Sequence, residues 1–377
     1  NTTGYQNTSV GRSALAANTT ANNNSALGYY ALTANTTGEN NTAIGASSLG
    51  ANTTADNNTA VGKGALLLNT TGERNTALGS QALDANTTGN YNTALGHNSG
   101  SANTTGTHNT FVGDYSAPVN TTGAYNTAIG QSSLGANTSA DSNTAVGFFA
   151  LRYNTTGTAN VAVGTQALDA NTTADGNNAI GKDALGANTT GASNVAIGQQ
   201  ALTTNTTGSN NTAIGHVALG DNTTASNNTA VGYLALNANT TGDLNVAVGT
   251  QALDANTVGD RSVAVGHGAL TNQNPASKSD MNNTAVGLNA GAAVTTGTRN
   301  TLIGSEAGDA LTTGVKNTII GYATDASANN GDSQIILVYA VVGHGDNKFT
   351  FGEGTGNNRV YNSFTVNASW TRVSDVR

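Results

Sequence analysis

The chain has 377 residues, of which 48 are glycine and 9% are charged, with a net charge of −8 and no cysteine. Thirteen Lys and Arg residues in an acidic chain cannot form the basic surface that nucleic-acid binding requires. No apolar run approaches the ~20 residues of a membrane span. Because cysteine is absent, thiolate metal sites and disulfides are excluded. Such a composition indicates disorder or a periodic structure, and the regularly placed aliphatic residues favour the periodic structure.

The first part of the chain is a strict tandem repeat. An Asn-Thr-Thr triplet or a near variant begins at Asn1 and recurs every 17 residues as far as Asn256, sixteen times in all. The consensus reads N-T-T-G-x-x-N-T-A-(V/I)-G-x-x-A-L-x-A, and its residues are numbered here as positions 1 to 17. Such units bury a core only by stacking on their neighbours, so the period predicts a solenoid.

Two short strands are expected in each coil. The aliphatic residue at position 10 alternates with Thr or Val at position 8, so we expect both on the inward face of the first strand. The Leu at position 15, which follows Ala or Ser, indicates a second strand. Gly at position 11 and the Asn-Thr-Thr-Gly segment supply the turns and leave no room for a helix.

The fold class predicted is therefore all-β, a parallel β-solenoid (β-roll) of 17-residue coils. Stacked coils would align Asn over Asn and Thr over Thr in hydrogen-bonded ladders. At ~4.8 Å per coil, 19 coils would extend roughly 90 Å. A two-strand roll is thin and leaves one flat side poorly covered, so we expect three chains to pack around an axis as a homotrimer.

The period slips once. The position-11 glycine recurs every 17 residues from Gly11 to Gly266, and the next is Gly287, 21 residues further on. Four residues are therefore inserted between Ala269 and Met281, and we expect a loop on one coil. The predicted shaft spans residues 1–325, with 19 coils and this insertion near residues 270–281.

Residues 326–377 are predicted to form a β-rich C-terminal stem or cap. The runs 335–339 and 348–351 are strand-like and are separated by Gly and Asn turns. Trp370 is the only tryptophan, and we expect it to pack at the trimer axis or in the cap.

The N-(T/V)-A-(V/I)-G-x-x-A core resembles the head repeats of trimeric autotransporter adhesins, and the same kind of repeat occurs in bacteriophage tail-fibre shafts. The resemblance implies a left-handed coil, a homotrimer and a location outside the cell or on a virion. The function expected is that of a structural fibre or adhesin shaft, without catalytic activity, that extends and presents a binding surface.

The segment from Phe364 to Arg377 resembles the junction into an endosialidase-type intramolecular chaperone, which opens with Ser-Asp-x-Arg. The resemblance implies self-cleavage before Ser374, whose hydroxyl would attack the preceding carbonyl. The chaperone body and its assisting Lys are missing from this sequence. We therefore expect the chain to be part of a longer protein and unable to perform this step alone.

Aromatic side chains mark candidate receptor contacts. Tyr91, His108 and Tyr125 occupy position 6 of consecutive coils, and Tyr115 lies on another turn nearby. Such columns suit stacking against a host-surface glycan. The alternative is local packing, since Gly100 and Ala117 replace the core Leu in this region.

Other candidate sites are weaker, and neither a metal nor a cofactor is expected. A column formed by Glu39, Asp56 and Glu73 at position 5 would suit Ca²⁺, or would simply be solvated. The His residues lack the spacing of metal ligands and are assigned to coil turns, namely His97, His108, His216 and His267. The Asn-Thr-Thr triplets match glycosylation acceptors but are also turn residues.

Surface binding and catalysis are the two alternative function classes. Stacked Thr and Asn ladders, with Thr2 and Thr3 as the first members, would suit an ice- or surface-binding solenoid. A polysaccharide lyase or hydrolase on a β-helix would need clustered carboxylates, or Tyr and His in a groove, which coils this uniform do not offer.

Overall fold

The computed structural model describes residues 2–354, 359–363 and 371–372 of the chain. They fall into two compact units, Asn1–Thr190 and Gly191–Arg377. Both units are parallel β-solenoids, and no helix occurs among the described residues. Trp370 and the Ser374 junction lie outside the described residues.

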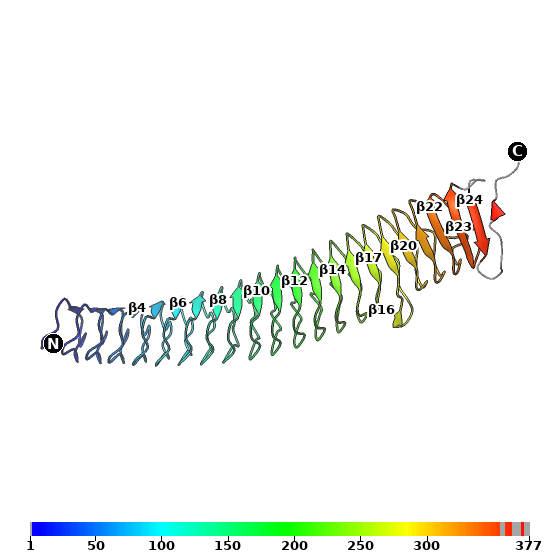
Figure 1. Cartoon of the computed structure of the whole chain (residues 1–377). Coiled ribbons are helices and arrows are strands. Elements are labelled where there is room, and N and C mark those ends of the chain that lie inside the picture. The colour runs from blue at the N-terminus through cyan, green and yellow to red at the C-terminus, as the bar shows by residue number, and fades with distance from the viewer. Residues whose placement is uncertain (1, 355–358, 364–370, 373–377) are drawn as a thin grey trace. The chain divides into compact units, whose positions relative to one another are not determined.

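In the first unit each coil contributes one three-residue strand, and successive strands pair in parallel (Figure 1). Each residue faces its counterpart 17 positions along, as Thr42 faces Thr59. The strands are β1 Thr8–Val10, β2 Ser25–Leu27, β3 Thr42–Ile44, β4 Thr59–Val61, β5 Thr76–Leu78, β6 Thr93–Leu95, β7 Thr110–Val112, β8 Thr127–Ile129, β9 Thr144–Val146, β10 Val161–Val163 and β11 Asn178–Ile180.

The second unit continues this plan and ends in a small antiparallel sheet, in which β24 pairs with β23 and β25 pairs with β24. Its strands are β12 Val195–Ile197, β13 Thr212–Ile214, β14 Thr229–Val231, β15 Val246–Val248, β16 Gly259–Asp260, β17 Val263–Val265, β18 Ser279–Asp280, β19 Thr284–Val286, β20 Thr301–Ile303, β21 Thr318–Ile320, β22 Ile335–Tyr339, β23 Lys348–Glu353, β24 Arg359–Ser363 and β25 Thr371–Arg372. Parallel pairing reaches β22 and β23, beyond the predicted shaft end at residue 325.

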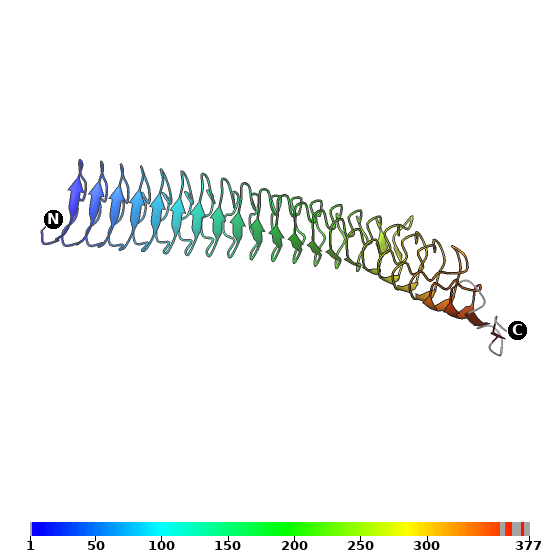
Figure 2. The ribbon, with the colours of Figure 1, turned by 90° about the horizontal axis from the view of Figure 1, so that it is seen from above.

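The second strand expected around position 15 does not form. Positions 13 and 15 have left-handed backbone, with φ of 58° at Ser47 and 49° at Leu49, and this alternation is incompatible with an extended chain. The segment still bonds to the next coil, since the Leu49 amide donates to the Ala65 carbonyl at 3.0 Å. Each coil is therefore one strand layer and one layer of linked turns (Figure 2).

The inward residue of the strand is position 9, which corrects the expected register. Ala43 is buried, its neighbour Ile44 is exposed, and Thr42 is half-buried. Leu49, at position 15, is buried as predicted. The Leu from the turn layer fills the interior, so the facing strand has room only for a methyl group.

The exceptions support this explanation. Where position 15 is Gly100, position 9 of the next coil is Phe111, and a Cβ on Gly100 would lie 2.5 Å from the Phe111 ring. A Cβ on Gly291 would likewise lie 2.5 Å from Leu302. Phe111 and Leu302 are both fully buried. Interior volume is conserved by exchanging large and small residues between the two layers.

Two buried columns of Asn side chains run through the stacked coils. At position 1, Asn52 Nδ2 donates to Asn35 Oδ1 at 2.8 Å. At position 7, Asn41 Oδ1 accepts from the Asn58 amide at 2.9 Å, and Asn41 Nδ2 donates to the Ala55 carbonyl at 2.9 Å. These side chains satisfy turn backbone that would otherwise be buried without a partner. The predicted Asn ladders are confirmed, and they are internal.

The inserted residues form a loop on one coil, as expected. Gln273 takes the place of the position-1 Asn, and its Nε2 donates to Asn256 Oδ1 at 3.2 Å. β18 of the loop pairs with β16 of the coil before it. Lys278 Nζ lies 2.6 Å from Asp243 Oδ2, which ties the loop to an earlier coil.

Candidate functional site

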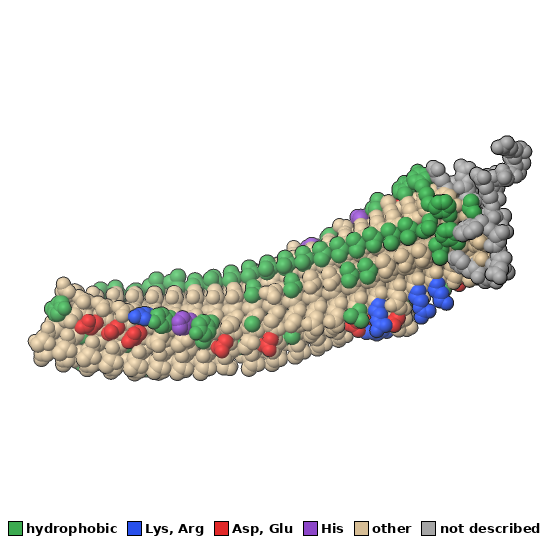
Figure 3. Space-filling view, in the orientation of Figure 1, with side chains coloured by type: hydrophobic (Ala, Val, Ile, Leu, Met, Phe, Trp, Pro, Cys, Tyr) green, Lys and Arg blue, Asp and Glu red, His purple; other side chains and the backbone are tan. Residues whose placement is uncertain are grey.

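A line of exposed aliphatic side chains runs along the outward face of the strand layer in each unit. This aliphatic stripe consists of the position-10 residues, one per coil, flanked by half-buried or exposed residues at position 8, most of them Thr or Val. Figure 3 shows it within each unit as a row of green side chains along one edge. Its most exposed members are Val10, Leu27, Ile44, Leu78, Leu95, Ile129 and Ile180 in the first unit and Ile197, Ile214, Val286, Ile303 and Ile320 in the second. Contiguous apolar surface of this kind is typical of an interaction surface.

Three predicted contact residues form a stacked column at position 6. The ring centroids of Tyr91 and His108 are 4.8 Å apart and those of His108 and Tyr125 are 5.0 Å apart, with interplanar angles of 19° and 16°. The Arg74 guanidinium lies over Tyr91, 5.3 Å from the ring centroid, and bonds to the Tyr91 hydroxyl. The column is therefore held together by its own ring faces, which leaves mainly ring edges for a ligand.

Tyr115 belongs to a different surface, on the turn layer. It lines a notch of about 270 Å³ with Pro118, Ser132, Gly135, Ala136, Arg152 and Tyr153. We call this the Tyr notch. It lies over Gly135, between Tyr115 one coil before and Tyr153 one coil after. The four aromatic and His residues predicted to share a function are thus divided between two places.

Arg152 is the most constrained side chain of the Tyr notch. Its guanidinium carbon lies 4.1 Å from the Phe149 ring centroid and 4.2 Å from that of Tyr153. Its Nε is 3.2 Å from Asp169 Oδ1. Burial raises the pKa of Asp169, and the Arg152 charge acts in the opposite direction. The guanidinium is therefore fixed in place and its charge is balanced.

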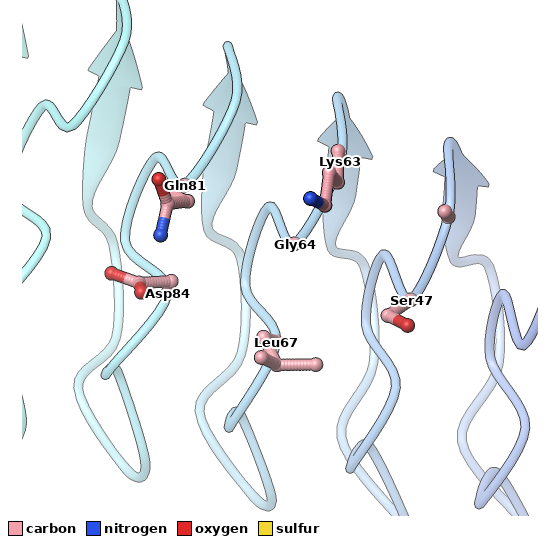
Figure 4. Close-up of a pocket in the computed structure, with 7 residues that line it drawn as sticks. Ser47, Lys63, Gly64, Leu67, Gln81 and Asp84 are labelled. Carbon is pink, nitrogen blue, oxygen red and sulfur yellow. The ribbon is translucent and has the colours of Figure 1, made fainter.

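A second, more polar hollow lies over Gly64, where Lys63, Gln81 and Asp84 surround a volume of about 220 Å³. Figure 4 shows these side chains on the turn layer, in front of the strands. Burial raises the pKa of Asp84, and one carboxylate oxygen has no hydrogen-bond partner. This carboxyl is the feature of the hollow that sequence reasoning missed.

The position-5 carboxylates have a structural role. Asp56 Oδ1 accepts from the Glu39 amide at 2.7 Å, and Glu39 in turn accepts from Asn22 at 2.8 Å. The described residues contain no cluster of three His, Cys, Asp or Glu side chains suited to a metal ion. His97 pairs with Asp114 at 3.1 Å on an exposed surface.

Sequence reasoning also missed Arg152 and Tyr153. Arg152 occupies the variable position 16, Tyr153 replaces the consensus Ala at position 17, and no motif marks either residue. The available signal was the alignment of coils, which places Gly135 one coil before Arg152 in the same column and one coil after Tyr115.

Within the described part of the chain, no helix is long and apolar enough to cross a membrane. Comparison of the sequence with protein-family models and with curated proteins gives no match.

Proposed function

We propose that the chain is a non-catalytic fibre or adhesin shaft that self-associates as a homotrimer and presents a binding surface outside the cell or on a virion. The observation that carries the proposal is the aliphatic stripe. It repeats once per coil along each unit, on a strand face that no other part of the described chain covers.

The regularity of the stripe indicates what covers it. Adjacent members lie on hydrogen-bonded parallel strands, as Ile197 and Ile214 do, so they repeat at about 4.8 Å. A partner that contacts the stripe over many coils must carry apolar groups at the same spacing. A second copy of this chain, running parallel, meets that requirement. The number three follows from the resemblance to trimeric fibres.

Light scattering on the intact chain in native buffer tests this proposal. We expect three times the 37.4 kDa chain mass. A concentration-independent mass of one chain would contradict it, and a mass of two chains would support the stripe as the interface but contradict the trimer.

The ice- or surface-binding alternative has one feature in its favour, an exposed Thr column at position 3 that includes Thr37, Thr54 and Thr71. The position-2 hydroxyls are occupied, since Thr36 Oγ1 donates to the Thr53 carbonyl at 3.0 Å. The Asn ladders are buried and cannot contact a surface. A thermal-hysteresis assay at matched protein concentration separates the two functions, because a shaft gives no hysteresis.

A further inference from the structure

We propose that the Tyr notch is a binding site for one neutral sugar ring of a surface glycan. The inference deepens the proposed function, since it assigns the surface that the shaft would present. It does not depend on the oligomeric state, because the notch lies on the turn layer and the aliphatic stripe lies on the strand layer.

The walls of the notch are aromatic and exposed. Tyr115 and Tyr153 keep 43% and 49% of their surface accessible. The His97 ring meets Tyr115 edge-on, with centroids 5.3 Å apart at 80°, and the Arg152 guanidinium supports Tyr153. Pyranose rings have flat C–H faces that pack on such side chains, and the tyrosine hydroxyls can bond to sugar hydroxyls.

The floor of the notch exists because position 16 is Gly135. A Cβ there would lie 3.2 Å from both Cγ and the carbonyl oxygen of Arg152, so any side chain would occupy the space between the walls. The volume of about 270 Å³ lies just below the ~300 Å³ at which pockets for drug-sized ligands begin. This favours a single ring over a longer saccharide segment.

The charge balance favours a neutral sugar. Arg152 makes two contacts with Asp169, Nε to Oδ1 at 3.2 Å and Nη2 to Oδ2 at 3.3 Å. An acidic sugar would have to compete with this carboxylate for the guanidinium. Ser132 adds a hydroxyl beside the floor, a group suited to sugar hydroxyls.

The same plan occurs five coils earlier in the first unit. Tyr30, Ser47 and Gly50 precede Tyr115, Ser132 and Gly135 by 85 residues each. They line a notch that also measures about 270 Å³, in which Leu67 and Leu68 stand in place of Arg152 and Tyr153. This earlier notch has one aromatic wall, so we expect it to bind the same sugar more weakly.

The position-6 column is the natural comparison. The rings of this column stack face to face. Tyr125 ends the stack, is 61% exposed, and is the one ring of the column with an uncovered face. If exposed aromatic surface alone were enough, Tyr125 would bind sugar as well as the notch does. The notch offers two aromatic walls, Tyr115 and Tyr153, where Tyr125 offers one ring, so we expect the notch to bind more tightly.

Saturation-transfer NMR on the intact chain tests the inference, with the methyl glycosides of glucose, galactose, mannose and N-acetylglucosamine as probes. At least one probe should receive saturation, and Tyr153→Ala or Gly135→Ala should weaken its binding about tenfold. Tyr115→Asn should act in the same direction, with Asn chosen because residue 115 has a φ of 52°. Tyr125→Asn is the matched control and should leave binding unchanged.

Three results would overturn the inference: no transfer to any of the four probes, transfer that survives both Tyr153→Ala and Gly135→Ala, or equal loss in Tyr125→Asn. Thermal melts of each variant separate loss of the site from loss of the fold. Light scattering on the same samples keeps the shaft proposal separate, since a trimer that binds no sugar contradicts only the notch.

Discussion

Ala196 and Ile197 are neighbours on β12, yet Ala196 is fully buried and Ile197 is 38% exposed. The larger aliphatic residue therefore points out of the coil, and the smaller one points in. The same inversion recurs from coil to coil, and it converts what looks in the sequence like a core column into an external apolar line. That line is a reason to expect self-association.

The inverted register predicts different outcomes for three Asp substitutions. Ala196→Asp places an unpaired charge inside the coil and should destabilise the fold by about 3–5 kcal/mol. Ile197→Asp should leave the coil folded but separate the assembled chains, because it puts a charge into the aliphatic stripe. Gln199→Asp, at an exposed position, is the control.

Circular dichroism melts and light scattering together check this prediction. If Ile197→Asp unfolded the chain as fully as Ala196→Asp, the register in the structure would be contradicted. If Ile197→Asp remained assembled like Gln199→Asp, the stripe would not be the interface.

The buried Asn ladder predicts a pH-dependent defect. Asn58 Nδ2 donates to the Gly72 carbonyl at 2.9 Å, whereas the adjacent Asn57 is exposed. Asn58→Asp replaces this donor with a carboxylate and leaves the Gly72 carbonyl unpaired. The free energy of unfolding should fall by about 1–3 kcal/mol as a result. Burial would raise the pKa of the new carboxyl above its unfolded value. The defect should therefore be small near pH 4 and grow towards pH 7.

Asn57→Asp is the matched control, because Asp tolerates the left-handed backbone found at residue 57. Its melting temperature should follow that of the wild type at both pH values. Equal losses in the two variants, or an Asn58→Asp defect that is the same at pH 4 and pH 7, would contradict the internal ladder.

The sequence was sufficient to predict the period, the parallel stacking, the Asn ladders and the buried Leu at position 15. It did not settle the strand register, because Ala at position 9 and Val or Ile at position 10 are both apolar and adjacent. What decides between them is the space left by Leu in the facing layer. The pairing of Gly100 with Phe111 was the available clue, since a large residue replaces Ala in the coil that follows a missing Leu.

The candidate site was less predictable. Alignment of coils placed Tyr91, His108 and Tyr125 in one column, and the structure stacks them. Side chains at the variable positions define the Tyr notch, and whether they enclose a space depends on how the turn layer folds. That layer was expected to be a strand, so its left-handed residues and the directions of its side chains could not be foreseen.

The glycine at position 11 predicts a clear contrast between two Gly→Ala variants. Gly130 has a φ of 129°, and a Cβ there would lie 2.5 Å from the Gly147 carbonyl oxygen, which is fixed backbone of the next coil. Gly130→Ala should lower the free energy of unfolding by about 1–3 kcal/mol or more. Gly135 has no positive φ and its Cβ contacts are 3.2 Å, so Gly135→Ala should cost less. Urea unfolding of both variants measures the difference, and equal costs would contradict it.

Asp325 predicts how the C-terminal end of the second unit responds to pH. Burial raises the pKa of Asp325 to about 6, with Asp309 acting in the same direction, while the hydrogen bond from the Ala310 amide opposes the shift. A folded-state pKa above the unfolded value of 3.8 means that folding favours the protonated carboxyl. Stability should therefore be greatest below about pH 4, fall as the pH rises to about 6, and change little from this group above that value.

Hydrogen exchange at the Gly343 amide, which donates to the Asp325 backbone carbonyl at 2.8 Å, is the local readout for this prediction when measured from pH 4 to pH 7 and corrected for intrinsic rates. Asp325→Asn should remove the pH-dependent loss of protection, because the amide side chain keeps an acceptor for Ala310 and does not titrate in this range. Asp309→Asn should move the loss to lower pH, because it removes the neighbouring negative charge. A wild-type profile that Asp325→Asn leaves unchanged would show that another group controls the stability of this end.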